Sequence, residues 1–147
     1  MKLTIRQCEN VEPEVTVVYD ELTSEVEKVI SLLKGHALTL TGKADDELVR
    51  VKASHILYIE SVDDKTFAYT KEKVIRLNQS LASLTETLDN IKFFRCSKSM
   101  ILNIDMIEKL KSLPSNRIDA TMVGGEHILI SRTYAADLRK RLKRGRS

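Results

Sequence analysis

From residue 37 onward, short segments rich in β-branched and aromatic residues alternate with turn-forming residues, and this rhythm limits the possible folds more than any other feature of the sequence. Turn signals such as KADD, PSNR and GGE separate the segments, and strands bounded by such turns form antiparallel sheets. We therefore expect a mainly β fold with minor α content. The expected strands are residues 37–42, 45–61, 65–70, 73–78, 106–113, 117–123 and 127–131.

Two segments of this part follow a helical spacing instead. Residues 80–88 place leucines at positions 81, 84 and 88, which predicts a short helix. Residues 135–144 (AADLRKRLKR) predict a basic helix at the end of the chain. The stretch between them, FFRCSKSMILN at residues 93–103, sets polar and cationic residues directly against apolar ones.

Residues 1–35 have a different character and predict a ββα extension. KLTIRQ and EVTVVY alternate as strands do, and we expect them to pair across ENVEP. A helix follows, in which Ser24 and Glu27 form a capping-box pattern and Gly35 is a fitting end. We expect residues 1–35 to cap the domain or to support dimerisation, and residues 36–147 to form the main domain.

The charges are segregated along the chain, although the net charge is only +3. Residues 1–30 carry a net charge of −4 and residues 131–147 carry +6. A basic end suits a polyanion such as nucleic acid or an anionic membrane surface, but it can also be a solubilising tail. No signal peptide or membrane-spanning stretch is present, and two distant cysteines without metal-ligand spacing indicate reduced thiols and a cytoplasmic protein.

No pattern of catalytic residues is present, so we do not expect an enzyme, a cofactor, a metal site or a small-molecule substrate. The histidines at positions 36, 55 and 127 stand apart from any nucleophile motif. The acidic pairs Asp45–Asp46 and Asp63–Asp64 fall in turns, where carboxylates are usually solvated. Cys96 lies beside Arg95 and Lys98, which can lower a thiol pKa, so a thiol redox sensor stays open as an alternative.

Three stretches in this order and at these distances resemble the LytTR DNA-binding domain family of LytR/AlgR/AgrA-type bacterial regulators. They are HILYIESVDDKTFAYT, FFRCSKSMILNIDMIEKL and ILISRTYAADLRKRL, and the resemblance covers about residues 36–145. It implies small antiparallel sheets with short helices, and binding of double-stranded DNA through loops inserted in the grooves. Family members commonly have histidine where Cys96 or Ser97 falls, which leaves the target sequence open.

The resemblance also implies which residues contact DNA. In the stretch 93–103, the apolar residues would anchor a loop from which Arg95, Ser97, Lys98 and Ser99 face DNA, while Asn103 would hold the shape of the loop. The turn after YIE adds Lys65 and Thr66, although the neighbouring Asp63 and Asp64 repel phosphate. Arg132 would enter a groove, where its forked guanidinium suits guanine. Arg139 and Lys140 of the basic helix would add phosphate contacts.

The resemblance further implies a transcriptional regulator that acts as a dimer on repeated half-sites. The residues before the match are too few for a receiver domain of ordinary size, so we expect a standalone form without a phosphorylation input. A membrane-bound regulatory partner protein is a further expectation. A protein-interaction module, with the basic tail only solubilising, remains the alternative from another class.

Overall fold

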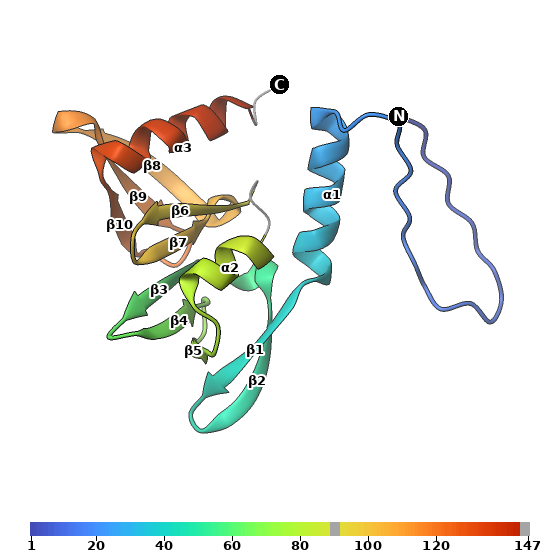
Figure 1. The fold of residues 1–147 in the computed structure, drawn as a ribbon, viewed down its shortest axis with the longest axis horizontal. Coiled ribbons are helices and arrows are strands. Elements are labelled where there is room, and N and C mark those ends of the chain that lie inside the picture. The colour runs from blue at the N-terminus through green and yellow to red at the C-terminus, as the bar shows by residue number, and fades with distance from the viewer. Residues whose placement is uncertain (89–91, 145–147) are drawn as a thin grey trace.

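The computed structural model describes residues 1–88 and 92–144, without the side chains of residues 35–37 and 144. This part of the chain contains three α-helices, with five strands between the first and second helix and five between the second and third (Figure 1). The helices are α1 (Ser24–Ala37), α2 (Leu81–Thr87) and α3 (Arg132–Arg144). The strands are β1 (Thr39–Ala44), β2 (Glu47–Lys52), β3 (Tyr58–Val62), β4 (Lys65–Tyr69), β5 (Val74–Leu77), β6 (Phe93–Ser97), β7 (Met100–Asn103), β8 (Ile107–Leu113), β9 (Arg117–Met122) and β10 (His127–Ile130). The expectation of a mainly β fold is confirmed.

The strands form two antiparallel sheets. Seven strands join in the order β2-β1-β5-β4-β3-β7-β6, and three join in the order β10-β9-β8. Gly42 permits the close approach of β1 to β5, because a Cβ at this position would collide with the backbone carbonyl of Arg76. The meander predicted for residues 106–131 is the three-stranded sheet.

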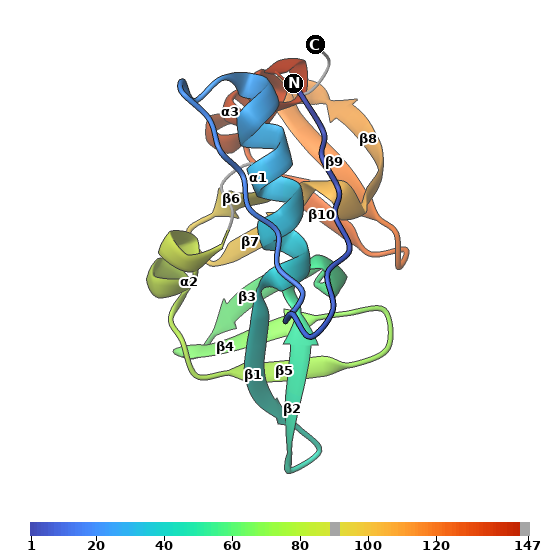
Figure 2. The same ribbon diagram turned by 90° about the vertical axis from the view of Figure 1, so that its right-hand side faces the viewer.

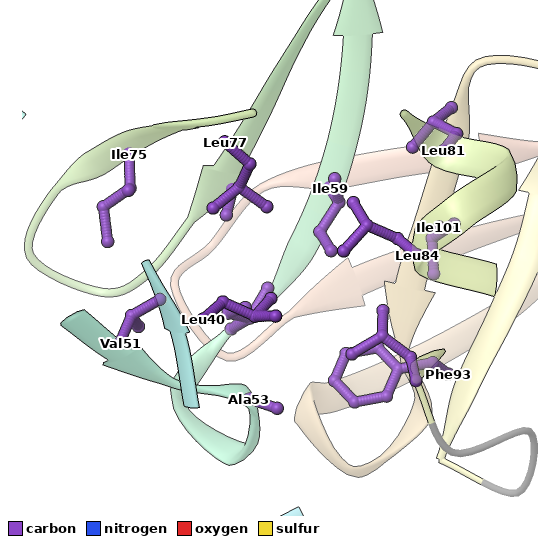
Figure 3. Packing of buried hydrophobic residues seen from close by; sticks show 13 residues of the cluster. Leu40, Val51, Ala53, Ile59, Ile75, Leu77, Leu81, Leu84, Phe93 and Ile101 are labelled. Atoms are coloured by element: carbon purple, nitrogen blue, oxygen red, sulfur yellow. The ribbon is translucent and has the colours of Figure 1, made fainter. Parts of the chain in front are cut away.

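One hydrophobic core lies between the seven-stranded sheet and α2. Ile59 of β3 and Ile101 of β7 are almost completely buried there, and Leu84 of α2 packs against them. Figure 3 shows Leu84 pointing between Ile59 and Ile101, with the ring of Phe93 beside them. The leucines predicted to form the apolar stripe of α2 are therefore the residues that attach this helix to the sheet.

A second core lies between the β6–β7 hairpin, the three-stranded sheet and α3. Phe94 and Leu102 of the hairpin are fully buried in it, together with Leu138 of α3. Phe93 and Ile101 of the same hairpin belong to the first core. The hairpin is thus packed on both of its faces, because side chains alternate along a strand.

The expected strand 45–61 is wrong in one respect, because it is divided in two. Residues Ala53–His55 form a 3₁₀ turn between β2 and β3. The amide of Ala53 donates to the carbonyl of Leu38 (2.9 Å), and the amide of Ile56 donates to that of Ala53 (3.1 Å). The first bond continues the β1–β2 pairing by one residue, and the second closes the 3₁₀ turn that separates β2 from β3.

The N-terminal helix is confirmed, but its cap differs from the prediction. The cap is Thr23, whose hydroxyl accepts a hydrogen bond from the amide of Val26 (3.3 Å), and Ser24 is the first helical residue. The helix continues past Gly35 to Ala37. A one-residue shift of the cap is a common outcome when Thr and Ser are adjacent.

The two strands predicted within residues 1–23 are not formed. These residues contain no helix or strand and extend away from the rest of the molecule as a long loop, which we call the N-terminal arm (Figure 1). Figure 2, in which the arm faces the viewer, shows it on the same side of the molecule as α1. A two-stranded hairpin with no surface to pack on is marginally stable in water, so strand patterning alone did not suffice.

Candidate nucleic-acid interface

The β6–β7 turn, residues 97–99, presents a cation at its tip and is held by its own hydrogen bonds. The guanidinium of Arg95 donates from Nε to the carbonyl of Ser97 (3.1 Å) and from Nη2 to that of Lys98 (2.5 Å). The hydroxyl of Ser97 accepts from the amide of Ser99 (3.2 Å). Lys98 and Ser99 are exposed. The turn therefore carries an exposed ammonium and a hydroxyl on a backbone that is already ordered.

The residues predicted to anchor this turn do so. Phe93, Phe94, Ile101 and Leu102 are at most 6% exposed, and Met100 is half-buried. Asn103 is 1% exposed, and its Nδ2 donates to the carbonyl of Ile56 (2.9 Å) while its Oδ1 accepts from the amide of Asp105 (3.1 Å). The expected shape-holding role of Asn103 agrees with these bonds.

The side chain of Arg95 was expected to face DNA, but in the structure its guanidinium folds back onto the turn. Two of its N–H groups are bound to carbonyls of the turn, so its first role is to close the turn. Sequence reasoning missed this, because the partners are backbone groups whose position depends on the register of the hairpin. A register shift between Arg95 and Ser97 is part of that geometry.

The turn between β3 and β4 lies directly beside the β6–β7 turn. The amide of Ser61 donates to the carbonyl of Ser99 (2.8 Å), and Glu60 of β3 pairs with Met100 of β7. Asp63 and Asp64 occupy the left-handed region, with φ of 51° and 62°. Such values at both central residues fit a two-residue hairpin turn.

The two residues predicted to bind DNA beside this turn, Lys65 and Thr66, differ in how exposed their side chains are. Lys65 is exposed, as expected. Thr66 is 5% exposed, so the expectation that it faces DNA is wrong. Thr66 points to the same face of β4 as the fully buried Ala68, because alternate residues of a strand share a face. The sequence did not reveal this, because the large apolar residues Phe67 and Tyr69 lie on the other face of β4 and favour that face as the buried one.

The third element is the start of α3. Arg132 is its first residue and is exposed, directly after the buried end of β10. The carbonyl of Ser131 accepts from the amides of Tyr134 (3.1 Å) and Ala135 (2.8 Å), which begins the helix. A cation is unfavourable at a helix N-terminus, so the charge of Arg132 does not stabilise α3. The charge of Arg132 instead adds to the positive end of the helix dipole, and the two together attract anions.

The remaining predicted cations follow on α3. Arg139 and Lys143 share a helical face with Arg132, and Lys140 lies exposed at the edge of that face. Arg141 points elsewhere: it donates to the carbonyl of Phe93 (3.3 Å), lies 5.0 Å from the centre of the Phe94 ring and is 3.8 Å from the carboxylate of Asp137. Arg141 therefore attaches α3 to β6.

These elements lie at one side of the molecule. The Arg141–Phe93 bond places the end of α3 beside the start of β6. From there, nine helical residues lead back to Arg132 over about 14 Å, and four strand residues lead to Ser97 over about 13 Å. Figure 1 shows the start of α3 and both hairpin turns on the left side, opposite α1 and the arm.

Among residues 1–88 and 92–144, no carboxylate lies within ion-pair distance of Lys65, Lys98 or Arg132. Three cations without an internal counter-charge thus gather on one side. Such an arrangement can bind the phosphates and base edges of a nucleic acid.

Cys96 does not have the properties of a reactive thiol. It is 1% exposed, and burial raises the pKa of its thiol to about 12 despite the neighbouring Arg95. Its Sγ lies 3.6 Å from the carbonyl of Met100. The thiol form therefore dominates at neutral pH, which argues against the redox alternative.

Among the described residues, no group of three or more histidine, cysteine or acidic residues could hold a metal ion. His127 pairs with the carboxylate of Asp119 (3.1 Å) at the surface, and the side chain of His36 lies outside the described residues.

A cavity beside Phe93 and Ile101 has a volume of about 10 Å³, which is room for one water at most. None of the described helices is long and apolar enough to cross a membrane.

Comparison with known proteins agrees with this geometry. The family model described as "LytTr DNA-binding domain" matches residues 46–143. The sensory transduction protein LytT of Bacillus cereus is 27% identical over 123 residues, which are 84% of this chain and 49% of that protein. An HTH-type transcriptional regulator of Staphylococcus aureus is 29% identical over 123 residues, which are 84% of this chain and 82% of that protein. The chain thus spans about half the length of LytT.

A solved structure is also similar. It is the LytTr DNA-binding domain of a putative methyl-accepting/DNA response regulator from Bacillus cereus, with 29% identity and a TM-score of 0.67. The match covers 71% of this chain and 95% of that one. In the described part of the present chain, strands separate all three α-helices.

Proposed function

This chain belongs to the LytTR DNA-binding domain family, which is a family of DNA-binding regulators and not of enzymes, and we propose that it is a sequence-specific transcription regulator that binds duplex DNA through two hairpin turns and the start of α3. The observation that carries the proposal is the gathering of Lys65, Lys98 and Arg132 on one side without internal counter-charges. The family supports DNA as the partner, and the geometry supports these elements as the contact surface.

The β6–β7 turn is proposed to contact the sugar-phosphate backbone. Lys98 and Ser99 are exposed at its tip and offer an ammonium and a hydroxyl to phosphate oxygens. Arg95 and Ser97 fix the shape of the turn through their bonds to turn backbone groups. Because both cores hold the hairpin, little conformational entropy remains to be lost on binding.

Arg132 is proposed to enter a groove and read a base. Its guanidinium has no carboxylate partner in the described part of the chain, and its planar fork can donate two hydrogen bonds to guanine O6 and N7. Arg139 and Lys140, further along α3, add phosphate contacts. Lys65 serves the same purpose beside the β3–β4 turn.

The protein is further proposed to bind two repeated half-sites on the DNA as a dimer. The DNA elements and the N-terminal arm occupy opposite sides of the molecule, so two copies can associate without covering the DNA surface (Figure 1). A cytoplasmic location is proposed on the basis of the DNA partner. The membrane-bound regulatory protein expected from the family resemblance stays a prediction, and co-purification from a detergent-solubilised membrane fraction tests it.

Selection of bound duplexes from a random pool, followed by fluorescence anisotropy on the enriched sequence, tests the function. We expect one enriched motif, usually repeated, and a log–log salt slope of about −5 if about six phosphates are neutralised. Arg132→Ala should weaken binding to that motif by about 1–3 kcal/mol and relax the preference at one base pair.

Arg50→Ala is the matched control, because Arg50 is an exposed arginine on β2, outside the three elements. It should leave the base preference unchanged. A pool that shows no enrichment, or an Arg132→Ala protein with unchanged preference and affinity, would contradict the proposed use of this surface.

A further inference from the structure

The N-terminal arm has the sequence pattern of a hairpin with one apolar face, yet in the single chain that face is uncovered. If the chain turns at residues 9–11, Leu3 lies opposite Val17 and Ile5 lies opposite Val15. In the structure, Leu3 is 84%, Ile5 is 83% and Val15 is 74% exposed. The face with this pattern contains Met1, Leu3, Ile5, Val15, Val17 and Tyr19.

The other face of the same pattern is mostly polar, with Val18 opposite Lys2 as its apolar exception. The register that joins Ile5 to Val15 also brings Arg6 opposite Glu14 and Thr4 opposite Thr16. Opposite charges on paired strand positions are favourable. The pairing is therefore consistent on both faces, and what the single chain lacks is a surface that covers the apolar one.

From these observations we infer that the N-terminal arm is a dimerisation element, which becomes a β-hairpin when its apolar face packs against the arm of a second copy of this chain. Two identical apolar faces related by a two-fold axis cover each other, which is the usual symmetry of a homodimer. A two-stranded hairpin gains stability only when such a face is buried, which accounts for the lack of strands in the single chain.

A second copy fits the arm better than a lipid surface does. Glu12, Glu14, Asp20 and Glu21 give the second leg a strong negative charge, which an anionic bilayer repels. In a two-fold stack of apolar faces, the carboxylates of Glu12, Glu14 and Asp20 lie on the outer, polar face, and Glu21 lies beyond the paired residues. The helix α1, which carries the 53% exposed Leu32, lies on the same side of the molecule as the arm (Figure 2).

Sedimentation equilibrium of the full chain tests the inference. The wild type should sediment as a species of twice 16.7 kDa. The double variant Ile5→Glu/Val15→Glu should raise the dimer dissociation constant by about 100-fold or more, because it would bury unpaired carboxylates. The control Thr4→Glu/Thr16→Glu adds the same charges on the polar face and should remain a dimer.

Folding is checked separately by thermal unfolding. Neither core includes arm residues, so the apolar-face variant should unfold at the wild-type temperature. A spin label on Cys8 gives a second readout, since Cys8 is exposed and Cys96 is buried. Its spectrum should show slow motion in the wild type and fast motion in the apolar-face variant.

The dimer inference deepens the proposed function but can fail independently of it. On a duplex with one half-site, the apolar-face variant should bind like the wild type, and on two half-sites it should lose the cooperative gain. A wild type that is monomeric at every concentration, or a control that dissociates as much as the apolar-face variant, would overturn the inference. Absence of DNA binding with an intact arm-dependent dimer would instead contradict the proposed function alone.

Discussion

Replacing Asn103 by alanine should destabilise the fold strongly, because its amide bonds to one buried and one partly buried backbone group. Its Nδ2 donates to the carbonyl of Ile56 over 2.9 Å, and its Oδ1 accepts from the amide of Asp105 over 3.1 Å. The side chain is 1% exposed, so water cannot reach the carbonyl of Ile56 without rearrangement. The unsatisfied buried carbonyl costs about 1–3 kcal/mol and the lost part-buried bond about 0.5–1.5 kcal/mol, which gives a loss of about 2–4 kcal/mol in the free energy of unfolding.

Thermal and urea unfolding, followed by circular dichroism, measure this loss. For a domain of this size, 1 kcal/mol corresponds to about 2–4 °C, so the midpoint should fall by about 10 °C. Asn78→Ala is the control, because Asn78 is an exposed asparagine at the end of β5. It should change the midpoint by no more than about 2 °C.

Binding of DNA separates this structural role from a direct contact. Asn103 ends β7 at the end opposite the β6–β7 turn, so well below its midpoint the variant should bind DNA within about twofold of the wild type. A midpoint equal to that of Asn78→Ala would refute the reasoning, because it would mean that these two bonds contribute almost nothing. A large loss of affinity in the folded variant would refute the assignment of Asn103 to structure alone.

The other predictions concern the turn, the buried threonine and the thiols. Lys98→Ala should reduce the magnitude of the log–log salt slope by about 0.9, as expected for one lost phosphate contact, whereas an unchanged slope would remove Lys98 from the interface. Thr66→Val should leave DNA affinity and salt slope unchanged, because Thr66 is buried, and a clear loss of affinity in anisotropy would restore it as a contact. In the native protein, a thiol reagent near neutral pH should react with Cys8 and not with Cys96, whose pKa is raised to about 12 by burial, and reaction of both before denaturation would contradict the structure.

Patterns that depend on near neighbours allowed correct predictions. The leucine spacing of residues 80–88 identified α2, because its apolar stripe is what packs on the sheet. The meander of residues 106–131 and the basic helix were equally visible. Asn103 could be predicted as structural, since a lone amide between an apolar strand and a turn usually bonds to backbone.

The errors came from backbone partners that no local pattern reveals. Arg95 resembles a surface cation in the sequence, but the geometry of the hairpin turn brings the carbonyls of Ser97 and Lys98 to its guanidinium. The 3₁₀ turn closed by the bond from Ile56 to Ala53 divides a segment that reads as one strand. The prediction of two strands within residues 1–23 was wrong because a needed contact is missing. The sequence alternates as a strand pair does, but the single chain offers no surface on which such a pair could pack.

The packing of the β6–β7 hairpin has a consequence for how such regulators diverge. Both cores hold Phe93, Phe94, Ile101 and Leu102, whereas Lys98 and Ser99 contribute to neither. In the proposed interface, the residues that contact DNA are therefore different from those that keep the chain folded. Exposed residues such as Lys98 and the base-reading Arg132 can be exchanged with the rest of the scaffold left as it is.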